Sequence, residues 1–560
     1  MMAEASDTLK NLSYSSSKEG EPSVEAQFVE ESAGATSREH ESRQSYLKGF
    51  RLYTITAVLS LCLFLTNIEI PIVTTALVSI TNDLGAFDRA SWVISAYLLG
   101  YVSVLIIFSK LSDVFGRKFT LLAVVLIFAI FSGACGASQT IEQLIVFRAF
   151  QGVGGAGTNS LATVILIELV PSEKYAKYTS AVSLVYSLSL LLGPILGGVI
   201  SQYATWRWIF LINVPSAVAA AVVLFLTIPN GFPYHGVPRH ERPNGGHTLS
   251  RASLRRIDYI GTTLLLLSTL SIVAALEEAG LRFPWKSAYV ITLLIIAGVG
   301  WTVFLLWERR VTLHAKVQEP VFPWRFVQSR VWVGMLLTVF FLGAPFFATN
   351  FQLPQRLQIV NGLSPTDAGV RVIPFTLAAP FGSVLAPIVC KVGKVPPIYL
   401  VIFAAIVQVI GFSLISTLPY SKTPIAAQYG YEIIAGFGCG INITLLILMT
   451  PFSVQARDKA VALGTITQFR VMGGAIGLAI VTAVFNSLVR SQLGEQISST
   501  DLSTLLTSPA TITTFPPDVQ ETIRVTFADG YALQAKVLAG LAAGQIPASL
   551  LMWQAKQIVV

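Results

Sequence analysis

The chain has 560 residues, of which 53% are hydrophobic and 12% are charged, and its mean hydropathy is +0.66. Soluble domains carry about 25% charged residues, so this composition excludes a soluble protein and indicates one that lies largely in a membrane. The net charge of +8 does not indicate a nucleic-acid partner, because the basic residues are scattered through short connections and form no basic tract with interleaved aromatic residues.

Residues 1–45 are rich in Ser and Glu and poor in aromatic residues. Such a segment cannot bury enough apolar surface to fold alone, and it does not have the pattern of a cleavable signal peptide. We predict a disordered cytoplasmic tail over residues 1–50.

Apolar runs then recur almost to the C-terminus, each long enough to cross about 30 Å of hydrocarbon, which takes about 20 helical residues. Continuous runs such as "LLAVVLIFAIFSGACGA" predict helices, because barrel strands alternate polar and apolar residues. The predicted fold class is an all-α integral membrane protein. We predict fourteen spans, at 52–78, 90–109, 119–138, 142–168, 178–202, 209–229, 258–279, 287–307, 332–353, 366–389, 397–417, 427–451, 459–488 and 531–553.

The connections richest in Lys and Arg all lie on the side of the N-terminus. They include "SKLSDVFGRK" at 109–118 and "ERRVTLHAKVQEPVFPWRFVQSR" at 308–330. Because positive loops stay inside, this side is predicted to be cytoplasmic.

A weak internal repeat divides the chain. "SKLSDVFGRKFTLL" overlays "APIVCKVGKVPPIYL", so that Gly116 falls on Gly393 and Arg117 on Lys394. We predict a six-helix bundle over 51–230, cytoplasmic loops with two inserted helices over 231–330, and a second six-helix bundle over 331–560. Repeats that enclose a midplane site are typical of secondary transporters.

Cysteine and histidine do not form the pattern of a metal site. The four cysteines lie inside apolar runs, and the five histidines lie outside the predicted spans. A primary pump would need a phosphate-binding G-x-x-x-x-G-K-[ST] loop, which the sequence lacks. We predict no metal, no cofactor and no enzyme activity.

Three charged residues fall inside predicted spans, where each costs about 2.5–3.5 kcal/mol on insertion scales. They are Glu69, Arg148 and Arg470. Glu69 and Arg148 lie at similar depth, roughly 10–14 Å from the outer ends of their spans. A carboxylate beside a guanidinium can take and release a proton as water access changes, so we predict proton coupling there; a permanent salt bridge is the alternative. Arg470 could hold an acidic substrate group or pair with a carbonyl.

Four motifs together resemble the major facilitator superfamily, and specifically the fungal-type fourteen-span drug:proton antiporters. "SKLSDVFGRK" resembles the superfamily's cytoplasmic loop motif, with Ser109 in place of its first Gly, and "LIVFRAFQGVGGAG" resembles its fourth-span motif. "GPILGGVI" resembles the antiporter motif of span 5, although Ser180 and Ser189 stand where that motif has its first two glycines. "WRWIFLINVP" is typical of the fourteen-span group.

The resemblance implies a role for each motif. Gly193, Pro194, Gly197 and Gly198 would form the antiporter helix motif, with small residues that let another helix approach. Asp113, Gly116, Arg117 and Lys118 would form a cytoplasmic gate, and we expect Asp113 to meet the first turn of the helix that begins near "ARDKAVALG". We assign the substrate cavity to a wider set, namely Gln151, Tyr186, Gln352, Gln355 and Arg470.

The function that the resemblance implies is proton-coupled antiport, which exports small, largely apolar organic compounds and is driven by the proton gradient. Uptake of iron-siderophore complexes and ligand sensing without transport are the alternatives. The expected partners are the substrate, protons and membrane lipids, with no nucleic acid, and the expected assembly is a monomer. We expect the plasma membrane, with a vacuolar or other internal membrane as the alternative.

Overall fold

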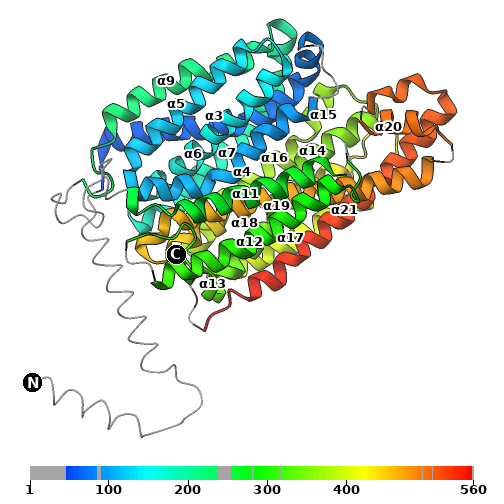
Figure 1. The fold of residues 1–560 in the computed structure, drawn as a ribbon. Helices are drawn as coiled ribbons and strands as arrows, with labels where there is room; N and C mark the ends of the chain where they lie inside the picture. The colour runs from blue at the N-terminus through cyan, green and yellow to red at the C-terminus, as the bar shows by residue number, and fades with distance from the viewer. Residues whose placement is uncertain are drawn as a thin grey trace, which may run out of the picture. The chain divides into compact units, whose positions relative to one another are not determined.

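The computed structural model describes residues 46–84, 90–235, 254–279, 283–314, 317–494, 496–507, 509–555 and 557. The predicted tail at 1–50 lies almost wholly outside these ranges. Within them the chain is helical (Figure 1), and its β structure is limited to two isolated bridges between single residues.

The first group of helices covers the predicted N-terminal bundle. Its members are α3 (Gly49–Leu84), α4 (Ala90–Phe115), α5 (Arg117–Ala137), α6 (Ile141–Glu168), α7 (Tyr175–Tyr203), α8 (Arg207–Leu211) and α9 (Asn213–Thr227). The middle group consists of α11 (Tyr259–Glu278), α12 (Ala288–His314) and the short α13 (Arg325–Gln328).

The last group covers the predicted C-terminal bundle. It consists of α14 (Arg330–Ile359), α15 (Pro365–Arg371), α16 (Ile373–Gly393), α17 (Pro397–Ser416), α18 (Ala427–Ser453), α19 (Lys459–Leu493), α20 (Ser499–Thr507) and α21 (Pro517–Leu550). A long helix therefore lies at each of the fourteen predicted spans, with α8 and α9 together covering the sixth.

Twelve helices in the described part of the chain are long and apolar enough to cross a membrane, which makes the protein an integral membrane protein. The helices α6 and α21 are not among the twelve. In α6 the reason is visible, because nearly every residue from Gln151 to Ile167 is buried by neighbouring helices, and an enclosed helix needs little apolar surface. The count of fourteen spans stays a prediction.

Helices of the first group contact one another closely, as do those of the last group. Thus α3 packs on α7 and α6, α4 packs on α6, and in the last group α16 packs on α18 and α14 on α19. The inserted pair α11 and α12 pack on each other, and α11 also contacts α4 and α19 (Figure 1). Contacts of α7 with α16 and α18, and of α4 with α19, join the two groups.

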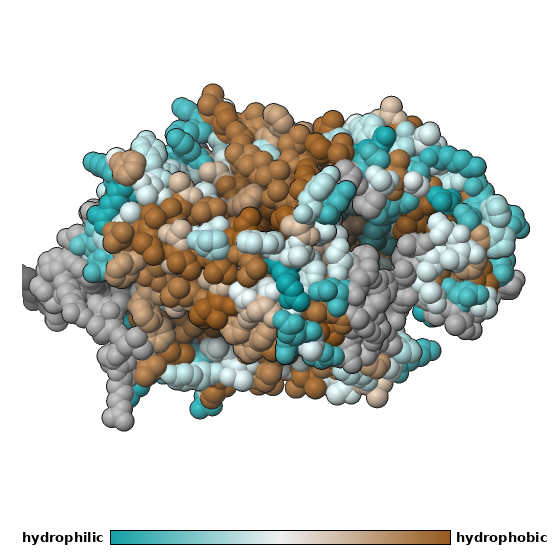
Figure 2. Space-filling model, turned by 90° about the horizontal axis from the view of Figure 1, so that it is seen from above, coloured by the Kyte–Doolittle hydropathy of each residue, from teal (hydrophilic) through white to brown (hydrophobic). Residues whose placement is uncertain are grey.

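Apolar side chains cover the middle of the molecular surface. Figure 2 shows a broad hydrophobic area with hydrophilic residues gathered toward its two ends. Large apolar side chains are exposed on several helices, such as Phe225 on α9, Val299 on α12 and Phe381 on α16. Such a surface is the expected contact with lipid tails.

The segment "SKLSDVFGRK", predicted as a loop, is almost entirely helical. Helix α4 continues to Phe115 and α5 begins at Arg117, so Gly116 alone stands between them. Its φ of 97° is one that residues with a Cβ rarely adopt, and its carbonyl accepts a hydrogen bond from the Thr120 hydroxyl at 3.0 Å. The turn is therefore made by one glycine, and the charged residues flank it on helices.

Candidate proton-coupling and gating sites

Glu69 and Arg148 form an ion pair inside the first group of helices. Arg148 Nη1 lies 2.6 Å from Glu69 Oε2, and both side chains are fully buried. Glu69 is held on α3 and Arg148 on α6, about two turns after the Thr140 side chain that caps this helix. The similar depth predicted from the sequence thus corresponds to direct contact.

Further partners hold each member of the pair. Asn213, at the start of α9, donates its side-chain amide to Glu69 Oε1. Arg148 donates from Nε to the Val93 carbonyl at 3.0 Å, and its guanidinium carbon lies 4.3 Å from the centre of the Tyr97 ring. Every face of the pair is therefore occupied by protein. The sequence analysis missed Asn213, although a lone Asn within the apolar stretch of "WRWIFLINVP" is a usable signal.

Gln151 belongs to this ion-pair cluster and not to a substrate cavity. Its Oε1 accepts a hydrogen bond from Arg148 at 2.8 Å, and its Nε2 donates to the Ser132 hydroxyl on α5 at 2.8 Å. The reason is helical spacing, because Gln151 lies three residues after Arg148 and so shares its face of α6.

The antiporter motif on α7 packs against the segment of α3 that follows Glu69. A Cβ on Gly193 would approach Pro71 Cγ to 2.6 Å, and one on Gly197 would collide with the Ile72 carbonyl and the Thr75 hydroxyl. A Cβ on Gly198 would meet nothing within 4 Å. Of the three predicted glycines, Gly193 and Gly197 thus allow the close approach, whereas Gly198 does not take part because it lies on another face of the helix.

Arg470 and Tyr186 meet where the two groups of helices face each other. The guanidinium carbon of Arg470 on α19 lies 5.1 Å from the centre of the Tyr186 ring on α7, a cation–π contact. The Tyr186 ring lies 5.7 Å from Phe346 on α14. Arg470 Nε is buried without a hydrogen-bond partner among the described residues, so a donor remains available at this position.

The two predicted glutamines of α14 do not share a site with Arg470, and their own surroundings differ. Gln352 lines a small cavity of about 30 Å³ between α14, α17 and α21, together with Arg356, Tyr531 and Gln534. That space holds about one or two waters. Gln355, three residues further along α14, is exposed and does not line this cavity.

A second buried polar cluster, which the sequence analysis did not assemble, adjoins that cavity. Arg356 Nη1 donates to Gln428 Oε1 at 3.3 Å, and Gln428 Nε2 donates to Glu432 Oε1 at 2.7 Å. Its signal in the sequence was the i, i+4 spacing of Gln428 and Glu432 on one helix face.

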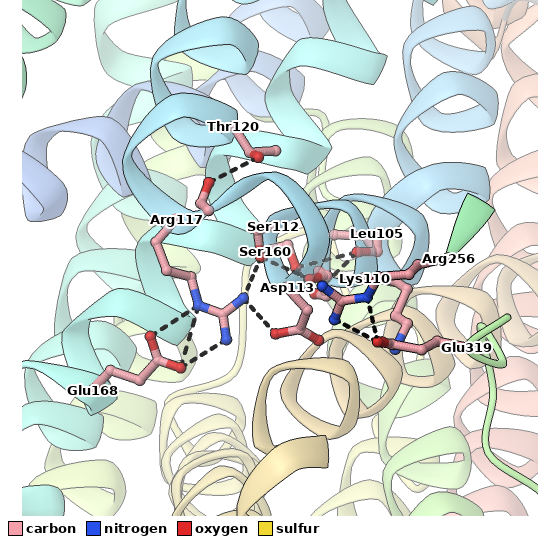
Figure 3. A network of polar contacts seen from close by, with 12 residues as sticks. Leu105, Lys110, Ser112, Asp113, Arg117, Thr120, Ser160, Glu168, Arg256 and Glu319 are labelled. Atoms are coloured by element: carbon pink, nitrogen blue, oxygen red, sulfur yellow. Dashed lines mark hydrogen bonds and ion pairs between the residues drawn. The ribbon is translucent and has the colours of Figure 1, made fainter. Parts of the chain in front are cut away.

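The cytoplasmic gate residues form a charge cluster around Arg117 (Figure 3). Arg117 Nη1 lies 2.6 Å from Asp113 Oδ1, and Nη2 lies 2.8 Å from Glu168 Oε1 at the end of α6. Burial, followed by the Glu168 carboxylate, raises the pKa of the nearby Tyr234 to about 12, so this tyrosine stays neutral beside the cluster. Lys118 lies outside it and bonds Asn230 Oδ1 at 3.1 Å.

The end of α4 lies against the start of α19. The amide of Ile106 donates to Gln468 Oε1 at 3.1 Å, and a Cβ on Gly464 would collide with the Ser109 hydroxyl. Since the two helices run in opposite directions, Asp113, one turn beyond Ser109, lies level with the first turns of α19. Its latch role stays a prediction.

The helical membrane fold, the paired bundles and the polar groups enclosed within them define a membrane transporter and not an enzyme. The profile of the Major Facilitator Superfamily matches residues 59–277 and 259–478. The chain belongs to this superfamily.

Curated relatives and solved structures agree with this membership. The MFS-type transporter FPY5 of Fusarium mangiferae is 41% identical over 494 residues, which cover 88% of this chain and 82% of the relative. The MFS-type efflux pump LUC4 of a Fusarium species is 30% identical and covers 81% and 77% of the two chains. A bacterial homologue of the human lysosomal transporter Spinster, solved in an inward-facing, unoccupied conformation, has a TM-score of 0.55 at 16% identity and covers 91% of this chain and 100% of its own.

Proposed function

We propose that the protein exports small, largely apolar organic compounds in exchange for protons. Export is supported by relatives named as efflux pumps, such as LUC4. The observation that carries proton coupling is the fully buried pair of Glu69 and Arg148, because a charged pair within a membrane bundle is costly and is retained where it does work.

The proton acts by cancelling one charge of this pair. When Glu69 binds a proton it loses its charge attraction to Arg148, whose guanidinium keeps its contacts with the Val93 carbonyl, Gln151 and the rings of Tyr97 and Phe210. The α3 segment next to Glu69 is then free to shift against its neighbours.

Helix α7 transmits that shift to the other bundle. It contacts α3 through Gly193 and Gly197, and it reaches the C-terminal bundle through two hydrogen bonds, Ser180 Oγ to the Ser383 carbonyl at 3.1 Å and Ser183 Oγ to Thr444 Oγ1 at 2.7 Å. One helix thus touches the proton site and the interface whose opening exposes substrate.

The substrate binds, in this proposal, beside Tyr186, Phe346 and Arg470. The two rings offer apolar contact, and the free donor of Arg470 selects compounds with an acceptor or acidic group. This position lies between the bundles, as alternating access requires.

The test is transport in inside-out vesicles with an imposed pH gradient, using a panel of fluorescent hydrophobic dyes and one ferric siderophore. We expect gradient-driven dye transport that falls at least tenfold in Glu69→Gln, since the amide keeps size and polarity but carries no proton. Dye transport that persists at the parental rate in the mutant would overturn the coupling role. Gradient-driven release of preloaded siderophore from these inside-out vesicles, without dye accumulation, would overturn export.

The same mutant leaves a guanidinium buried without its counter-charge, which can cost about 3–5 kcal/mol of stability. Glu69→Gln combined with Arg148→Gln removes both charges. Normal insertion and thermal unfolding of this double variant, without gradient-driven transport, separates loss of coupling from loss of fold.

A further inference from the structure

The segment between α12 and α14 lies along the predicted cytoplasmic ends of both bundles. We call residues 317–328 the strap. Three of its side chains are almost fully buried. Val321 and Phe326 are 2% exposed, and Phe322 is 4% exposed. A connecting loop has no need for this packing, so the strap is held in one place.

One end of the strap is bound to α4. Glu319 Oε2 accepts a hydrogen bond from Lys110 Nζ at 2.6 Å, and Figure 3 shows Lys110 and Arg256 converging on the Glu319 carboxylate. The Glu319 amide also donates to the Arg256 carbonyl at 2.9 Å. Lys110 adjoins Ser109, the residue of α4 that touches α19.

The other end of the strap is bound to α19. Arg325 donates to both carboxylate oxygens of Asp458, from Nε and from Nη2, at 2.5 Å each. Asp458 directly precedes α19, and its side chain is only 6% exposed. A bidentate guanidinium–carboxylate contact is among the strongest and most directional ion pairs in proteins.

The middle of the strap is fixed to α12. The Val321 amide donates to Glu308 Oε1 at 3.3 Å, and the Trp324 amide donates to the Thr312 hydroxyl at 3.0 Å. The two inserted helices therefore support the strap, and the ends of the strap bind one helix from each bundle.

We propose that the strap clamps the cytoplasmic ends of α4 and α19 together, and that its pair of Arg325 and Asp458 must separate each time the cavity opens to the cytoplasm. The inference rests on the proposed function only in requiring that the cytoplasmic side opens during export. The proposal assigns a role to the inserted helices α11 and α12, which is to support a clamp that lies outside the two six-helix bundles.

The first experiment measures opening without measuring transport. Ser109→Cys places a thiol in the contact between α4 and α19, in a chain whose four described cysteines are all buried. An impermeant maleimide is applied from the cytoplasmic face of inside-out vesicles. We expect Arg325→Gln to raise the labelling rate of this thiol at least fivefold.

Matched variants exclude a general loosening of the fold. Exchanging the charges, with Arg325→Asp and Asp458→Arg together, should restore the slow labelling that either single change abolishes. Lys422→Gln removes an ion pair of 3.6 Å with Glu521 on the opposite side and should leave labelling unchanged. Equal labelling in Arg325→Gln and the parent, or no recovery in the exchanged pair, would overturn the clamp.

The second experiment asks whether release is required. In Arg325→Cys with Asp458→Cys, a short bismaleimide fixes the strap to α19, and dye export should fall below one tenth of its uncrosslinked rate. Export that continues after complete crosslinking would overturn the release step. The labelling results can also agree with the clamp while no gradient-driven transport is found. That outcome would contradict only the proposed antiport.

Discussion

The carboxylate of Asp113 shares its guanidinium partner with Glu168. Arg117 bonds Glu168 through Nε at 2.9 Å as well as through Nη2 at 2.8 Å, so Glu168 alone can keep Arg117 in position. Asp113 is therefore not the only carboxylate that holds Arg117. Because Asp113 lies level with the first turns of α19, a second role for its charge, as a latch to α19, can be tested.

We predict that Asp113→Asn shifts the protein toward states open to the cytoplasm and slows turnover. A carboxylate near a helix N-terminus contributes about 0.3–1 kcal/mol, which corresponds to a population shift of up to about fivefold. The readouts are labelling of Ser109→Cys from the cytoplasmic face and the turnover of dye export. Lys422→Gln, at an exposed residue far from this cluster, is the control. Unchanged labelling together with unchanged turnover would refute the latch.

Much of this charge chemistry was accessible from the sequence, and some was not. The similar depth of Glu69 and Arg148 could be predicted from their distance to the span ends. Their direct contact could not, because the sequence does not show that spans 1 and 4 are adjacent. The bonds of Lys110 to Glu319 and of Arg325 to Asp458 could not be predicted, because they join residues 209 and 133 positions apart in connections with no periodic pattern. Membrane orientation is by itself a sufficient explanation for basic residues in loops, so the sequence does not indicate a further role for them.

At the scale of elements, α3 and α7 approach each other closely just after Glu69. Gly193 and Gly197 face α3, whereas Gly198 faces open space. Two adjacent glycines of one helix therefore provide a matched pair for testing whether this contact matters.

We predict that Gly197→Ala impairs both stability and export, whereas Gly198→Ala changes neither. The added methyl group at Gly197 meets backbone atoms of α3 that cannot rotate away, and overpacking of this kind typically costs about 1–3 kcal/mol. Thermal unfolding in detergent and gradient-driven dye transport are the measurements. Equal behaviour of the two variants would show that the approach of α3 and α7 is not limiting.

The positions of the long helices were the most predictable property of the fold, because each long apolar run has room for only one span. Their ends were less predictable. Charged residues from Lys110 to Arg117 suggested a loop, yet ion pairs within the cluster compensate their charges and let α4 continue to Phe115.

For the whole molecule, the strap and the Glu69 site should respond to pH in different ranges. Glu319 lies outside the spans; burial acts to raise its pKa, but the charges of Lys110 and Arg256 outweigh burial and hold the pKa below its ordinary value of 4.5. The carboxylate is therefore ionised throughout the neutral range, so the strap stays charged during the proton exchange that we propose for Glu69.

We predict that the stability contributed by Glu319 is complete above about pH 5 and is lost as the pH falls through its lowered pKa. The sign follows because the unfolded carboxylate binds a proton more readily than the folded one. The measurement is the difference in unfolding temperature between the parent and Glu319→Gln, from pH 8 to pH 4. A difference that already shrinks between pH 7 and pH 6 would show that another group controls this bond.

The burial of α6 has a consequence for the biogenesis of the protein. This helix carries Arg148 and a run of small and polar residues from Gln151 to Ser160, and it falls short of the apolarity of the twelve candidate spans. A segment with an arginine penalised by about 2.5–3.5 kcal/mol on insertion scales is a poor substrate for the translocon by itself. We therefore expect α4 and α5, which are synthesised first and pack against α6, to remain beside the translocon until α6 arrives, with Glu69 as the counter-charge of Arg148.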